Sequence, residues 1–163
     1  MFDGVSEYIQ MPNTVSFNDQ NFAASVWFKT STSGDRKIIS MNVTSHPLQI
    51  FGNNIRTCVN GTCNVGATTV TDNAWHFAIV VGTTANTSLY LDGKSTPETV
   101  ISPASATISG APTIAALATL SNFYGGTLDE VRIYSRNLTS MEMRDLYLAG
   151  AARHGMQVAD MKY

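Results

Sequence analysis

The acidic side chains are the residues in this sequence most able to carry out chemistry. Glutamate occurs at Glu7, Glu98, Glu130 and Glu142, and only Glu130 has an adjacent carboxylate, Asp129. A glycosidase needs two carboxylates about 5–10 Å apart around one bond. Adjacent residues of a strand point to opposite faces, so Asp129 and Glu130 are not expected to act on one substrate. The sequence also contains no phosphate-binding loop and no histidine cluster with metal spacing, so it predicts a protein that is not an enzyme.

The cysteines are the second pair with a chemical role. Cys58 and Cys63 flank Asn60-Gly61, a dipeptide that favours a two-residue hairpin turn. Such a turn places the two cysteines opposite each other at a non-hydrogen-bonded position, with Cα atoms about 4.5–5.5 Å apart. That spacing suits a disulfide. We therefore predict a Cys58–Cys63 bridge that pins the hairpin tip in an oxidising compartment, outside the cell or at its surface.

The composition indicates the kind of element that carries these residues. The chain has 163 residues and a net charge of −2, and only 13% of its residues are charged. Thr, Ser, Asn and Gly together supply 58 residues, which favours strands and turns. There is no cluster of Lys and Arg, so we expect no nucleic-acid partner. No apolar run approaches the roughly 20 residues of a membrane span, so we expect no membrane insertion.

Alternation of apolar and polar residues predicts about ten short strands. In 22–29, for example, Phe22, Ala24, Val26 and Phe28 share one face, while 75–81 is a continuous apolar run typical of a central strand. The other expected strands are 5–11, 37–41, 48–51, 55–59, 87–91, 113–117 and 127–134. Strands at this spacing favour a sandwich or jelly roll.

One helix is expected near the end of the sequence. Thr139 and Glu142 have the spacing of a capping box, and Met143, Leu146 and Tyr147 follow at helical spacing. Gly150 is expected to end the helix in a left-handed conformation. We expect this helix to pack as a lid on a sheet edge or at one end of the sandwich.

Five motifs in a fixed order carry a family resemblance. They are Phe2-Asp3-Gly4, the strand 22–29, the strand that begins Trp75-His76-Phe77-Ala78, the hairpin Leu89-Tyr90-Leu91-Asp92-Gly93-Lys94, and the strand 126–134 followed by the helix. This series resembles the laminin G-like branch of the concanavalin A-like lectin/glucanase superfamily. The resemblance implies an all-β, two-sheet antiparallel jelly-roll sandwich with one short C-terminal helix. It covers a domain at 1–150, which leaves 151–163 as a tail, a linker or a packed return segment.

The resemblance also implies a place for a metal. It sets the first and last strands side by side, so Asp3 and Asp129 are predicted to hold a structural Ca²⁺ through their carboxylates. Asp3 could instead serve its own Asp-Gly bend, and Asp129 could pair with Arg132 or a backbone amide. Asp72 or Asp92 could contribute to a loop site instead.

The function implied by the resemblance is binding without catalysis. Glucanases of this fold have a Glu-x-Asp-x-x-Glu strand, and none of the four glutamates here begins that pattern. We expect an extracellular binding or adhesion module that recognises a glycan or a surface protein within a larger chain or assembly. The alternative is a structural or protein-interaction domain of a surface appendage, cell-surface protein or virion, with no small ligand. Trp27, Tyr90, Tyr124 and Tyr134 are candidate sugar platforms by residue type alone, and Trp27 is more readily a core residue.

Overall fold

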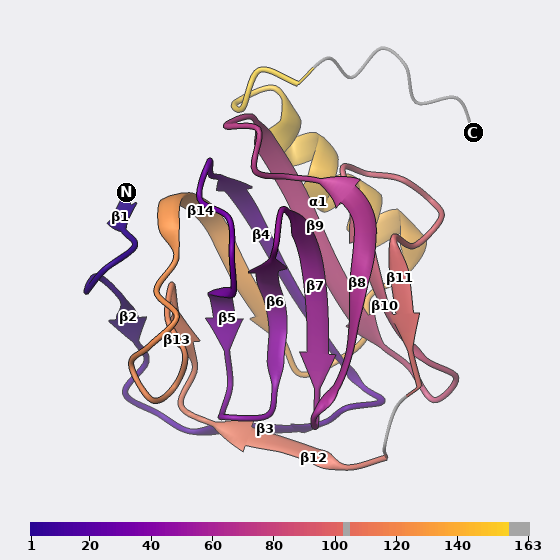
Figure 1. The fold of residues 1–163 in the computed structure, drawn as a ribbon. Coiled ribbons are helices and arrows are strands. Elements are labelled where there is room, and N and C mark those ends of the chain that lie inside the picture. The colour runs from indigo at the N-terminus through magenta and orange to yellow at the C-terminus, as the bar shows by residue number, and fades with distance from the viewer. Residues whose placement is uncertain (103–104, 157–163) are drawn as a thin grey trace.

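The protein is a sandwich of two antiparallel sheets with a helix on its outer side (Figure 1). The computed structural model describes residues 1–102 and 105–156. Within these residues the chain forms two large sheets, a short pair of strands that closes one end, and a single helix. We call the sheet that carries the helix the back sheet and the other the front sheet. The predicted all-β jelly-roll class is confirmed.

The strands follow a jelly-roll order. The back sheet consists of β1 (Phe2–Asp3), β14 (Gly125–Tyr134), β4 (Phe22–Lys29), β9 (Trp75–Gly82), β10 (Thr87–Leu91) and β11 (Thr99–Ile101). The front sheet consists of β2 (Ile9–Gln10), β13 (Thr113–Ile114), β5 (Arg36–Ser40), β6 (His46–Phe51), β7 (Asn54–Val59) and β8 (Thr62–Thr69). The closing pair is β12 (Thr107–Gly110) with β3 (Val15–Asn18). Strand β1 pairs with β14, so the first and last strands are neighbours, as the resemblance implies.

The main core lies between the two sheets. Phe22 and Phe28 of β4 meet Leu48 and Ile50 of β6 there, and all four are fully buried. Alternation along β4 places Trp27 on the opposite face of the back sheet. Strand β9 is covered on both faces, with Val80 in the main core and Phe77 on the far side. This explains its continuous apolar sequence.

Helix α1 (Ser140–Ala151) covers the outer face of the back sheet rather than a sheet edge. It begins as predicted, because the Thr139 and Glu142 side chains each hydrogen-bond the other's backbone. The Tyr147 ring stacks on Trp27 at 5.6 Å between ring centroids. The expected end at Gly150 is wrong, because α1 continues to Ala151 and its cap, Ala152, is right-handed.

The fold contains elements that the sequence did not predict, among them the short strands β3, β11 and β12. Strand β8 was not expected, because its Thr, Asn and Gly residues give no apolar alternation. After α1 the chain folds back, and the Met156 backbone N–H donates to Ala151 O at 2.9 Å. The rest of the predicted tail, 157–163, lies outside the described residues. Among the described residues, no helix has the length and apolar character needed to cross a membrane.

Candidate functional site

The outer face of the front sheet carries a row of polar side chains. Lys37 pairs with Gln49 across β5 and β6, and Gln49 pairs with Arg56 across β6 and β7. Their sequence neighbours Leu48 and Ile55 belong to the core. Alternation therefore points Lys37, Gln49 and Arg56 away from the core. We call these three residues, together with Ser40 and His46, the polar face.

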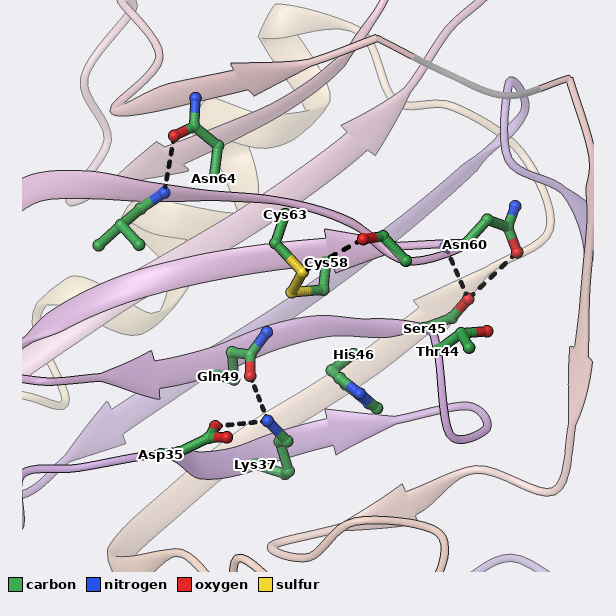
Figure 2. Close-up of a disulfide and its surroundings, with 12 residues drawn as sticks. Asp35, Lys37, Thr44, Ser45, His46, Gln49, Cys58, Asn60, Cys63 and Asn64 are labelled. Atoms are coloured by element: carbon green, nitrogen blue, oxygen red, sulfur yellow. Dashed lines mark hydrogen bonds and ion pairs between the residues drawn. A yellow bond between two sulfur atoms is a disulfide. The ribbon is translucent and has the colours of Figure 1, made fainter.

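The residues of the polar face hold one another in place, and Figure 2 shows part of the arrangement. Lys37 Nζ donates to Gln49 Oε1 at 2.5 Å and also pairs with the Asp35 carboxylate. The Arg56 guanidinium lies 4.4 Å from the ring centroid of Phe51, which is 45% exposed. The polar face therefore supplies two cations and an amide, and it borders the carboxylate of Asp35 and the aromatic ring of Phe51.

Some donors of this face have no hydrogen-bond partner among the residues that the structure describes. Lys37 is only 5% exposed and Gln49 is fully buried. Among the residues that the structure describes, Gln49 Nε2 and Arg56 Nε are buried without a hydrogen-bond partner. Buried donors are normally paired, because an unpaired one loses its hydration without compensation. Within the described part of the chain these two donors keep unused hydrogen-bonding capacity, and an acceptor from outside would reach them once neighbouring side chains move.

His46 adds a neutral ring to the polar face. Its Nδ1 lies 3.1 Å from Ser40 Oγ. Burial, followed by the positive charge of Lys37, lowers the pKa of His46 to about 4. The ring is therefore uncharged at pH 7 and has one nitrogen that donates and one that accepts.

The predicted disulfide lies beside His46 on the same face. His46 pairs with Cys58 across the strands, and Cys58 pairs with Cys63. The two cysteines form a disulfide with their Cα atoms 4.1 Å apart. Asn60 and Gly61 have φ angles of 48° and 81°, as the predicted turn requires.

Contacts with the preceding loop fix the tip of this hairpin. The backbone N–H of Asn60 donates to Ser45 Oγ at 3.1 Å (Figure 2). The backbone N–H of Gly61 donates to Thr44 O at 2.9 Å. Asn60 Nδ2 also donates to Asp19 Oδ2 at 3.1 Å. The disulfide and these hydrogen bonds together hold one end of the polar face.

The two predicted calcium ligands lie at different places along β14. Asp3 pairs with Gly125, whereas Asp129 lies four residues further along the strand and pairs with Trp27. The Asp3 carboxylate accepts backbone N–H groups of Ser6, Val5 and Glu7, which hold its pKa well below the usual range. Asp3 thus serves its own bend, and a calcium ion shared with Asp129 stays a prediction.

The expectation that Asp129 and Glu130 point apart is wrong. Strand β14 has a bulge between Asp129 and Arg132, and Glu130 has a φ of 50°. The bulge breaks the alternation on which the expectation rested. A carboxylate oxygen of each residue lies within 4.8 Å of the other.

The other acidic candidates surround His76. Asp92 Oδ2 lies 2.8 Å from His76 Nδ1, and Asp72 Oδ1 lies 3.1 Å from Nε2. Burial lowers the pKa of His76, but the hydrogen bonds and charges of Asp92 and Asp72 outweigh it, so the net pKa is raised. Both carboxylates bind the His76 ring, which indicates that this cluster stabilises the fold.

The aromatic candidates are mostly packing residues. Trp27 and Tyr124 are fully buried, and Tyr90 and Tyr134 pack against the cluster beneath α1. Sequence reasoning missed Phe51 and Arg56. The available signal was the placing of Gln49 between Leu48 and Ile50, and of Arg56 next to Ile55, because such alternation points a polar residue away from the core.

Comparison with solved structures supports the fold. A heptameric pentraxin from Limulus polyphemus superposes with a TM-score of 0.68 at 13% identity, over 90% of this chain and 79% of that one. A putative carbohydrate-binding protein from Bacteroides ovatus gives 0.71 at 13% identity, over 88% and 45%. The ligand-binding domain of botulinum neurotoxin serotype D, solved with N-acetylneuraminic acid, gives 0.67 at 14%, over 93% and 42%. The chain thus spans less than half the length of the last two.

Sequence comparison identifies the family. No curated protein matches the sequence significantly. A laminin G-type family model, described as the concanavalin A-like lectin/glucanases superfamily, matches residues 3–144. That match covers most of the chain and agrees with the sandwich, the paired first and last strands, and the capped helix. The chain belongs to the laminin G-type family of the concanavalin A-like lectin/glucanases superfamily.

Proposed function

We propose that the protein is a non-catalytic module that binds carbohydrate through its polar face, outside the cell or at a cell surface. The observation that carries the proposal is the row formed by Lys37, Gln49 and Arg56, in which buried donors have no partner among the described residues. Sugar hydroxyls accept such hydrogen bonds at little desolvation cost. The exposed edge of Phe51 offers apolar surface for the C–H groups of a sugar ring.

The strands that carry the polar face are held in place by the main core on their other side. The side chains project from strands whose other face is packed into the main core, so their backbone positions are fixed before a ligand arrives. Preorganisation lowers the entropic cost of binding. Arg56 is only partly buried and its guanidinium lies over the exposed Phe51 ring, so this pair is where a ligand first meets the face.

The extracellular setting is supported by the disulfide. Structural disulfides persist in oxidising compartments and are rare in the reducing cytosol. The solved structures of similar fold include a protein described as carbohydrate-binding and a domain in complex with a sialic acid.

Binding should be measured against a panel of oligosaccharides and polysaccharides. We expect some members to bind with a dissociation constant of about 0.1–1 mM and none to be cleaved. Gln49→Ala and Arg56→Ala should each weaken binding more than about fivefold, which is a loss of about 1 kcal/mol. Arg136→Ala is the matched control, because Arg136 is an exposed arginine paired with Glu142 beside α1. Cleavage that is lost in Glu130→Gln or Asp129→Asn would contradict the non-catalytic assignment.

A structural or protein-interaction role is the second candidate function. It is favoured by an apolar groove of about 430 Å³ between the sheets, bordered by exposed Ile9 and Met11 and by Phe17 and Val131. This role would be favoured if no glycan of the panel bound and the protein instead associated with itself or with another protein. That association should be lost in Ile9→Ser.

A further inference from the structure

The β14 bulge gathers two carboxylates on the side of the back sheet that faces α1. Asp129 pairs with Trp27, whose ring belongs to the cluster beneath the helix. Glu130 has the left-handed φ of 50°, which is uncommon for a residue other than glycine. Bulges redirect side chains, and backbone strain of this kind concentrates at functional sites.

The turn after α1 brings a histidine to the same point. The His154 ring contacts two tryptophans, with its centroid 4.6 Å from that of Trp27 and 4.1 Å from that of Trp75. Its side chain is 5% exposed, and its Nε2 is buried without a hydrogen-bond partner among the described residues. Nε2 lies 3.5 Å from Asp129 Oδ2, too far for a good hydrogen bond.

We propose that Asp129, Glu130 and His154 form a binding site for one Zn²⁺ or a similar divalent transition-metal ion. One ligand atom from each residue lies within 4.8 Å of the other two. Four ligands at zinc bond lengths of about 2.1 Å stand roughly 3.4 Å apart in a tetrahedron. The 3.5 Å between His154 Nε2 and Asp129 Oδ2 already matches that edge. Glu130 completes the set when its carboxylate oxygen leaves Arg153 and turns towards the other two ligand atoms.

The ligand types select the class of metal. An imidazole nitrogen with two carboxylate oxygens is a zinc donor set with three protein ligands and an open fourth position. Calcium prefers six to eight oxygen ligands and makes little use of imidazole. The site therefore differs in ligands and in metal from a calcium site shared by Asp3 and Asp129.

The charged groups around Glu130 and the exposure of Asp129 allow a divalent cation to reach the proposed site. Glu130 pairs with Arg132 and Arg153 at 2.8 Å each, one arginine on each carboxylate oxygen, so one of these contacts has to open for an ion to bind. Arg153 is largely exposed, so its guanidinium is free to swing into solvent when a cation takes its place. Asp129 is 51% exposed, which gives the ion an entry path.

The test is a titration of untagged, chelator-stripped protein with Zn²⁺. Calorimetry measures the stoichiometry and the melting temperature, and tryptophan fluorescence reports on the ring contacts of the ligand histidine. We expect one Zn²⁺ per chain, a raised melting temperature and a change in emission, because Trp27 and Trp75 contact the ligand ring. Ca²⁺ should not compete at equal concentration.

Two variants probe the ligands separately. His154→Phe keeps an aromatic ring against the two tryptophans but removes Nε2, and it should abolish Zn²⁺ binding. Asp129→Asn changes a half-exposed residue, so it tests the site even if the histidine variant fails to fold, and it should weaken binding more than about tenfold. Asp72→Asn is the matched control, because Asp72 contacts a different histidine, His76. Absence of Zn²⁺ binding, or binding that Asp129→Asn leaves unchanged, would overturn the proposal.

Discussion

His46 links the stability of the fold to pH at the scale of a single residue. The pKa of about 4 in the folded protein lies below the usual value of 6.5. Between these values the unfolded chain binds a proton that the folded protein does not, so acid favours unfolding. The cause is the burial of the ring beside Lys37, which makes the charged imidazole costly.

The contribution of His46 should therefore disappear as the pH falls. Its share of the free energy of unfolding should decrease from pH 7 to pH 5 by up to about 2 kcal/mol. Urea unfolding at both pH values, compared with His46→Gln, measures that share. The variant should lose less stability than the wild type over this interval. Equal losses in the two proteins would contradict the assigned pKa shift.

Helix α1 and the β7–β8 hairpin show at the scale of elements what the sequence could specify. The Asn60-Gly61 turn fixes its own register, so the Cys58–Cys63 pairing could be derived from local rules. The same holds for the Thr139 cap. The end of α1 could not be derived, because Gly150 serves a contact with a distant residue instead of a left-handed turn.

The candidate site was harder to predict than the strands that carry it. Outward positions of β5, β6 and β7 follow from alternation, but their partners across the sheet depend on bulges that the sequence does not mark. The β14 bulge is the clearest case, because Glu130 adopts a conformation usually reserved for glycine. Tertiary packing decides such details, so Asp129 and Glu130 were expected to point apart.

Replacing Gly150 with alanine should destabilise the protein although alanine favours helices. A Cβ at this position would lie 2.1 Å from Trp27 Nε1. The helix would have to move away from the back sheet, at a cost of about 1–3 kcal/mol that exceeds the gain of about 1 kcal/mol in helix propensity. Chemical denaturation measures the difference. Asp145→Ala, at an exposed position of the same helix, should be neutral or stabilising. If the Gly150→Ala protein were as stable as the wild type, the contact between Gly150 and Trp27 would not be tight enough to exclude a methyl group.

Removing the disulfide should have a modest effect on the hairpin. The bridge closes a short loop, so the Cys58→Ser, Cys63→Ser double variant should lose about 2 kcal/mol of unfolding free energy. Urea unfolding of oxidised and reduced wild type provides the control, since reduction should cost a similar amount. A much larger loss would mean that the bridge also supports the front sheet beyond the hairpin.

The whole molecule has two unlike sides. Helix α1 covers the outer side of the back sheet (Figure 1). The polar face lies on the outer side of the front sheet, opposite the side chains that form the main core. The proposed zinc site belongs to the helix side and the proposed sugar contact to the other side. Ligands of the two sites should therefore bind independently, and the variants of one site serve as controls for the other.

The most direct test of the account is an NMR titration of isotope-labelled protein with a glycan that binds in the panel. Backbone amides of β5, β6 and β7 should shift, together with the Gln49 side-chain amide and the Arg56 Nε–H, and signals from α1 should stay unchanged. Shifts confined to the helix side, or to loops away from the front sheet, would contradict the assignment of the polar face as the binding surface.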